Sequence, residues 1–267
     1  IDLSYFDSSL ITEMRQMFEY CKSLTSVNFA NINTSLVTTF ESTFHGCTAL
    51  ESLNLSNFDT SNVVHMQWMF KECSSLISLD LANFNTSKCI EMNQMFNGCS
   101  SLISLNISSF NTSQVLRMHD LFRSCSKLTS LDISNFDTSK VTNMQYMFKG
   151  CSNLTSLDLS HFKTLNLEKM TEIFSGCINL EYINLKNYDE KKIKNYNNIF
   201  KNVPDNIVLC LNQENNISKI LSKIPKANCT VIDCTDNWEL KQKKIIIGTN
   251  ICIDNCKTIN KYEYNGK

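Results

Sequence analysis

Apolar positions along this chain repeat every 26 residues, without slippage over eight units. A phenylalanine marks the same place in each unit. The eight are Phe18, Phe44, Phe70, Phe96, Phe122, Phe148, Phe174 and Phe200. Strict self-similarity at this period predicts a solenoid, because one such unit cannot bury its apolar side alone and must stack on its neighbours.

Within a unit the apolar pattern changes its period. The L-x-x-L-x-L part, which includes Leu79 and Leu81, alternates inward apolar and outward polar residues and predicts a short strand. The V/C-x-x-M-x-x-M-F part, which includes Met92, Met95 and Phe96, has spacings of three and four and predicts a helical turn or two. Thr-Ser pairs precede this second part, and we expect their hydroxyls to cap its free N–H groups.

The strands are expected to pair in parallel along one side of a curved rod. Their starts fall at residues 1, 27, 53, 79, 105, 131, 157, 183 and 209. The expected fold is an α/β repeat, a leucine-rich-repeat solenoid with a parallel sheet on one face and short helical segments on the other. It spans residues 1–211 in about eight units, and the last unit, where Val203 and Pro204 replace the cysteine, suits a terminal cap.

The complete phrase, L-x-S-L-D/N-L-S-x-F-D/N-T-S-x-V-x-x-M-x-x-M-F-x-x-C, resembles the 26-residue repeat of the BspA-like leucine-rich-repeat surface proteins. The resemblance covers about residues 1–211. It implies a cell-surface protein, and adhesion to host or neighbouring-cell components is the usual proposal for that family. It supplies no catalytic or ligand-binding residues.

A cysteine also recurs at one place in seven units. These are Cys21, Cys47, Cys73, Cys99, Cys125, Cys151 and Cys177. A metal or redox wire is conceivable, but equivalent positions on stacked units form a single column, which cannot place four ligands around one ion. We interpret them as buried structural thiols that behave as small hydrophobic residues, and we expect no metal or cofactor.

The outward positions of the strands form the one continuous candidate binding face. Its residues are Ser52, Asn54, Ser78, Asp80, Ser104, Asn106, Ser130, Asp132, Ser156 and Asp158. One interpretation is a flat polar platform for a protein or glycan; the other is a solvated hydrogen-bonding ladder that merely prevents aggregation. Neighbouring aspartates offer too few oxygens to surround a calcium ion.

Charge and motifs narrow the function further. The net charge is −1 with 42% apolar residues, which describes a globular chain without the basic excess that nucleic acid attracts. No Ser-His-Asp, Cys-His, Walker or H-E-x-x-H pattern is present, so we expect no enzyme and no catalytic residues. The chain begins inside a repeat and has no bilayer-spanning apolar run, so we expect an excised piece whose membrane contact lies in absent parts of its parent.

Residues 212–267 lose the 26-residue period and form a Cys-rich segment that we expect to be truncated. Together with one cysteine from the last strand it holds five candidate disulfide cysteines: Cys210, Cys229, Cys234, Cys252 and Cys256. A disulfide-linked module is favoured over a zinc site, since the segment has no histidine and the cysteine gaps are unmatched. Such segments loosely resemble the stalks that follow BspA-like repeats.

These observations lead to two expectations of function. The first is a non-enzymatic protein at the cell surface or outside the cell that binds an extracellular or host protein or glycan through its repeats. The alternative is an intracellular leucine-rich-repeat scaffold for protein–protein interaction, with its tail reduced or zinc-bound. Counting free thiols separates them, because paired tail cysteines fit only the first.

Overall fold

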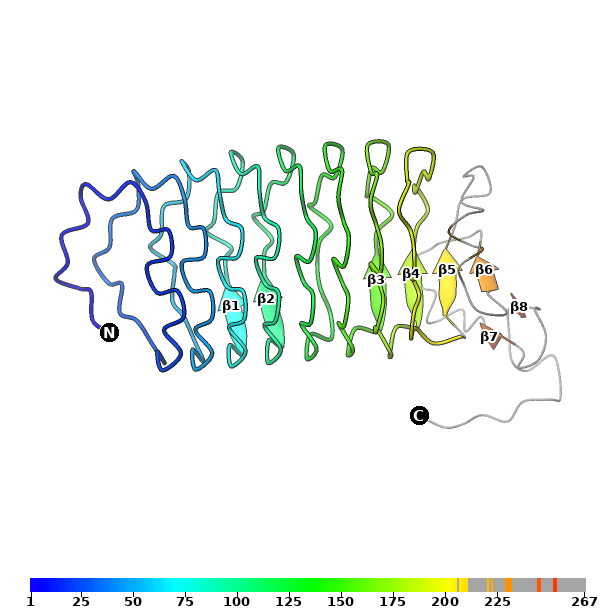
Figure 1. Ribbon diagram of the computed structural model, residues 1–267, viewed down its shortest axis with the longest axis horizontal. Helices are drawn as coiled ribbons and strands as arrows, with labels where there is room; N and C mark the ends of the chain where they lie inside the picture. Colours follow the sequence, from blue (N-terminus) through cyan, green and yellow to red (C-terminus); the bar gives the residue numbers. More distant parts are fainter. Residues whose placement is uncertain are drawn as a thin grey trace.

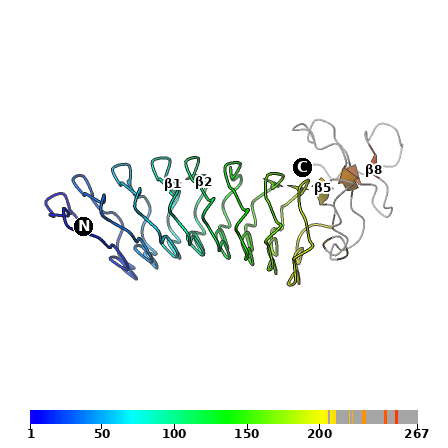
Figure 2. The same ribbon diagram turned by 90° about the horizontal axis from the view of Figure 1, so that it is seen from above.

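The computed structural model describes residues 1–205 and 207–210, residues 220 and 222, and the backbone of three short segments at 229–231, 244–245 and 252–253. Each 26-residue unit makes one coil, and successive coils lie side by side along the long axis of the molecule (Figure 1). The same stacking is seen from above (Figure 2). The strands are β1 (Ser78–Asp80), β2 (Ser104–Asn106), β3 (Ser156–Asp158), β4 (Tyr182–Asn184), β5 (Val208–Cys210), β6 (Cys229–Val231), β7 (Lys244–Ile245) and β8 (Cys252–Ile253).

The strand side of the coils is interrupted. β1 and β2 form one parallel pair, and β3, β4, β5 and β6 form a parallel four-stranded sheet. The predicted short parallel strands are therefore present, but the predicted continuous sheet is wrong. The segments around Leu53 and Leu131 form no strand with either neighbouring coil, although Ile77 N–H donates to Glu51 O at 3.2 Å.

The opposite side of the coils carries an unbroken ladder of single parallel bridges. Its members are Glu13, Thr39, His65, Glu91, Arg117, Asn143, Lys169 and Asn195, and each is bridged to the next one along the chain. The bridges on this side join every pair of neighbouring coils from Glu13 to Asn195, whereas strand pairing on the other side is missing between some coils.

No α-helix occurs in residues 1–205, so the predicted helical segments are wrong. The Met-rich part is a run of β-turns: Met95 N–H donates to Met92 O at 3.2 Å, whereas Phe96 N–H donates to Leu121 O of the next coil at 3.0 Å. Gln94 and Gly98 have positive φ angles of 58° and 81°, which end any helix and suit the third residue of a type II turn. The apolar spacing could not reveal this, because both conformations send the same side chains inward.

The phenylalanines that define the repeat stack through the whole core. Successive rings from Phe18 to Phe200 have centroids 5.4–6.0 Å apart, with interplanar angles of 20° or less. They pack among buried Met, Leu, Val and Cys side chains of the same coils. Each coil thus buries its apolar side only against its neighbours, as the repeat predicted.

The threonines of the Thr-Ser pairs join one coil to the next. Thr86 Oγ1 donates to Asn111 O at 2.9 Å and accepts Asn111 N–H at 2.7 Å. Thr60 makes the same two bonds to Asn85. The prediction that these hydroxyls cap helices is wrong, because no helix begins there and the free backbone groups belong to the following coil.

The last coil uses a carboxylate in place of this threonine. Glu190 is buried, and its Oε2 accepts the N–H of Ile220 at 3.1 Å. β6 meanwhile continues the ladder of β5 in parallel register, beyond the boundary that the sequence suggested at residue 211. The end of the repeat is thus covered by residues that follow it.

Candidate interaction surface

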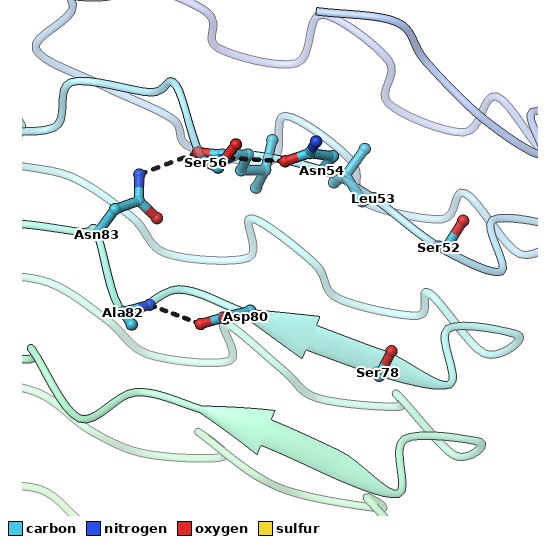
Figure 3. A pocket seen from close by; sticks show the side chains of 9 residues that line it. Ser52, Leu53, Asn54, Ser56, Ser78, Asp80, Ala82 and Asn83 are labelled. Atoms are coloured by element: carbon cyan, nitrogen blue, oxygen red, sulfur yellow. Dashed lines mark hydrogen bonds between the residues drawn. The ribbon is translucent and has the colours of Figure 1, made fainter.

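The predicted binding face lies on the strand side, in the two outward columns that the sequence indicated. Nine of its ten residues are exposed, and Ser156 is half-buried. The Asn and Asp side chains also shape the backbone: Asn54 Oδ1 accepts the N–H of Ser56 at 3.0 Å, and Asp80 Oδ1 accepts that of Ala82 at 3.0 Å (Figure 3). One oxygen of each such side chain therefore holds the turn after the strand, and the rest of the group faces solvent.

Hydrogen bonds lower the pKa values of two aspartates of this column, Asp2 and Asp132. A backbone hydrogen bond from Ser134, followed by its side-chain hydrogen bond, lowers the pKa of Asp132 below its ordinary value, and Ser4 does the same for Asp2. These two carboxylates therefore keep their negative charge at neutral pH.

A hollow of about 460 Å³ opens in this face between the coils of Asn54 and Asp80. Its walls carry the hydroxyls of Ser52, Ser56 and Ser78 beside these two side chains (Figure 3). At one end, Asn83 crosses to the neighbouring coil, where its Nδ2 donates to Leu55 O at 3.0 Å. The hollow coincides with an interruption of the sheet, because the Ser52–Asn54 segment does not pair with β1.

Two exposed isoleucines lie on the same side of the coils without lining the hollow, and the sequence pattern did not single them out. Ile77 directly precedes the lining residue Ser78, and Ile103 is the equivalent residue of the next coil. Ile77 and Ile103 directly precede β1 and β2 and are 49% and 51% exposed. Their column in the repeat otherwise holds polar residues: Thr25, Glu51, Thr129, Thr155 and Glu181. The signal that could have found them is this departure from the column.

We call these three columns together the strand face. Their members point outward on most coils, but Tyr182 and Asn184 in β4 are buried. The first is the column just described, with Ile77 and Ile103. The second comprises Ser26, Ser52, Ser78, Ser104, Ser130, Ser156 and Tyr182. The third comprises Asp2, Asn28, Asn54, Asp80, Asn106, Asp132, Asp158 and Asn184.

The cysteine column lies inside the coils. Cys47, Cys73, Cys99, Cys125, Cys151 and Cys177 are buried and free. Each thiol donates to the carbonyl oxygen of a phenylalanine in the preceding coil; for Cys99 the acceptor is Phe70 O at 3.1 Å. Cys21 differs from the prediction, since it is only partly buried: no preceding coil of this chain packs on it. A thiol at this place therefore fills a small apolar space and adds one hydrogen bond between coils.

Burial should make these thiols unreactive in the folded protein. It raises the pKa of Cys47 to about 11 and that of Cys99 to about 12, so almost no thiolate exists at pH 8. We expect iodoacetamide to label Cys21 rapidly and the six buried cysteines only after unfolding, as read by mass spectrometry of peptides.

The same shifts give a pH dependence of stability. Because the folded-state pKa values are raised, the unfolded chain loses its thiol protons first, and the free energy of unfolding should fall as pH rises above about 8.5.

For the labelling experiment, rapid reaction of Cys99 with iodoacetamide in the native protein would contradict the burial of the cysteine column.

Among the predicted disulfide cysteines, Cys210 in β5 is disulfide-bonded. The backbones of Cys229 and Cys252 lie in β6 and β8. The side chains of these two residues, together with Cys234 and Cys256, are outside the described residues, as is most of the predicted segment 212–267.

The repeated coil with parallel strands and a polar outer face defines a repeat protein. The chain matches the family described as "Mycoplasma protein of unknown function, DUF285" at residues 1–104 and 100–208, and it belongs to that family. The two matches cover the coils from the first to the last. No curated protein matches the chain. In the part that the structure describes, no helix has the length and apolarity to cross a bilayer.

Proposed function

We propose that this protein is a non-enzymatic, BspA-like leucine-rich-repeat solenoid that binds a protein or glycan outside the cell through its strand face. The observation that carries the proposal is the strand face itself: aligned hydroxyl, amide and carboxylate groups are exposed on successive coils. Stacked repeats commonly use such extended surfaces for partners. Polar groups elsewhere on the coils form hydrogen bonds with neighbouring coils, as Thr86 does with Asn111.

The disulfide at Cys210 supports a location in an oxidising environment. Structural disulfides persist outside the cytosol, where thiols are not kept reduced by glutathione and thioredoxin. The cell surface or the extracellular space is therefore the proposed site of action.

Two measurements test this function. Intact cells that produce the protein would be treated with a membrane-impermeant biotin reagent, and the purified chain would be applied to arrays of matrix proteins, mucins and glycans. We expect biotin on the lysines of the coils before lysis and binding to at least one array component. Labelling only after lysis, together with an array that stays blank, would reject the proposal.

The eight free thiols at described positions favour a second candidate, an intracellular scaffold that binds another protein of its own cell. Such thiols are ordinary in a reducing compartment. Counting the thiols of the protein purified from its own cells under alkylating conditions distinguishes the two: a paired Cys210 supports the surface protein, and a reduced Cys210 supports the scaffold.

A further inference from the structure

We propose that the partner of the strand face is a basic protein segment, which places a Lys or Arg side chain in the hollow beside Asp80 and an apolar side chain on Ile77 and Ile103. This inference rests on the proposed function and names the chemistry of its partner. Three independent features of the strand face support it: its charge, its hollow and its two exposed isoleucines.

The charges of the chain are unequally distributed around the coils. The chain has 25 Lys and Arg residues against 26 Asp and Glu, yet no Lys or Arg occupies the strand face. The strand face instead holds six exposed acidic residues: Asp2, Glu51, Asp80, Asp132, Asp158 and Glu181. On the opposite side of the coils, which carries the ladder of single bridges, basic and acidic residues are mixed and paired. Arg117, for example, pairs with Glu91 at 3.2 Å.

A surface of one sign selects a partner of the other sign. It steers a basic partner toward itself and disfavours sulfated or sialylated glycans through like-charge repulsion. The pKa values of Asp2 and Asp132 are lowered by hydrogen bonds, so these two side chains stay negatively charged below neutral pH. A basic protein segment therefore fits the strand face better than an anionic glycan does.

The hollow provides the place where a basic side chain can be held. Asp80 Oδ1 is already occupied by the N–H of Ala82, which fixes the carboxylate beside the hydroxyls of Ser52 and Ser78 (Figure 3). The second carboxylate oxygen of Asp80 and the two serine hydroxyls can each accept a hydrogen bond from a partner. A Lys ammonium, with three donors, or an Arg guanidinium, with five, would find several acceptors there at once.

The isoleucines supply the apolar part of the contact. Interfaces usually combine a desolvated apolar centre with a polar border, and charge alone gives on-rate more than affinity. Ile77 and Ile103 are neighbours on successive coils, and Glu51 and Thr129 flank them in the same column. An extended segment running along the stack can therefore place an apolar residue on them and a basic residue on Asp80.

The experiment uses the whole chain and an array of random dodecapeptides as the probe. A first variant carries Asp80→Asn, Asp132→Asn and Asp158→Asn, which the fold should accept because Asn54 and Asn106 occupy the same column. The control variant removes three acidic charges elsewhere, by Glu13→Gln, Asp59→Asn and Glu168→Gln. A further pair tests the two exposed isoleucines: Ile77→Thr with Ile103→Thr, against Ile178→Ser, which is 56% exposed outside the strand face.

We expect the wild-type chain to select peptides that combine Lys or Arg with Leu, Ile or Val. It should bind them more weakly at about 300 mM NaCl than at about 50 mM, because salt screens the attraction between exposed charges. The triple Asn variant and the double Thr variant should each bind about tenfold or more weakly, and both controls should bind as the wild type does.

Selection of neutral or acidic peptides, or equal binding by the triple Asn variant and its control, would overturn the inference. A blank peptide array with a positive matrix, mucin or glycan array would overturn it while leaving the proposed function in place. Blank results in both would reject the two together.

Discussion

Replacing Phe122 by alanine is expected to lower the free energy of unfolding by about 3–5 kcal/mol, the usual cost of truncating a fully buried phenylalanine. Phe122 is 0% exposed and lies between the rings of Phe96 and Phe148, with centroids 5.7 and 5.8 Å away. The alanine would leave a cavity that the rigid stack of coils cannot close. Urea unfolding followed by tyrosine and tryptophan fluorescence measures the effect.

Phe6→Ala provides the matched control, because Phe6 is 44% exposed and joins no ring stack. Its expected cost is below about 1 kcal/mol. Since each coil contacts only its neighbours, the Phe122 variant should also divide unfolding into two transitions, for the coils on either side. An equal effect of the two substitutions would contradict the continuous ring stack.

Thr86→Val is expected to lower the free energy of unfolding by about 2–4 kcal/mol, although valine has nearly the same shape. The substitution deprives both the N–H and the C=O of Asn111 of their partner in a part-buried position, and a desolvated backbone group without a partner costs about 1–3 kcal/mol. Thr86 is 0% exposed, so water cannot readily replace the hydroxyl.

Thr86→Ser is the control for this hydroxyl. Serine keeps both hydrogen bonds and loses one methyl group, so it should cost about 1 kcal/mol. Circular dichroism during urea unfolding gives the two values. If valine proved no worse than serine, the threonines would contribute by packing and the proposed bond between coils would be wrong.

The sequence predicted which residues face inward, because a strict 26-residue period can only arise from stacked equivalent positions. The columns of Phe and Cys and the short parallel strands follow from it. The helices were predicted wrongly for a physical reason: Met92, Met95 and Phe96 face inward equally well from a run of turns. Positive φ angles at Gln94, Trp68 and Tyr146 leave no mark that composition could reveal.

The candidate surface was likewise only partly predictable. Its serine, Asn and Asp columns could be read from the alternation of the strands. The hollow could not, because it depends on which coils fail to pair, and Leu53 and Leu79 look alike in sequence. The one-signed charge of the strand face was available in the sequence, but it becomes visible only when its three columns are laid side by side.

Hydrogen–deuterium exchange at one position of the repeat tests whether strand pairing is interrupted between some coils while the bridges on the opposite side join them all. Leu81 N–H donates to Asn106 O at 2.9 Å and Leu159 N–H to Asn184 O at 3.0 Å. The equivalent amides of Leu55 and Ile133 make no backbone hydrogen bond to another described residue. We expect slow exchange at Leu81 and Leu159 and exchange at least about a hundredfold faster at Leu55 and Ile133, as expected for local differences in protection. Uniform protection of all four amides would show a continuous sheet and contradict the interruption of the strand side.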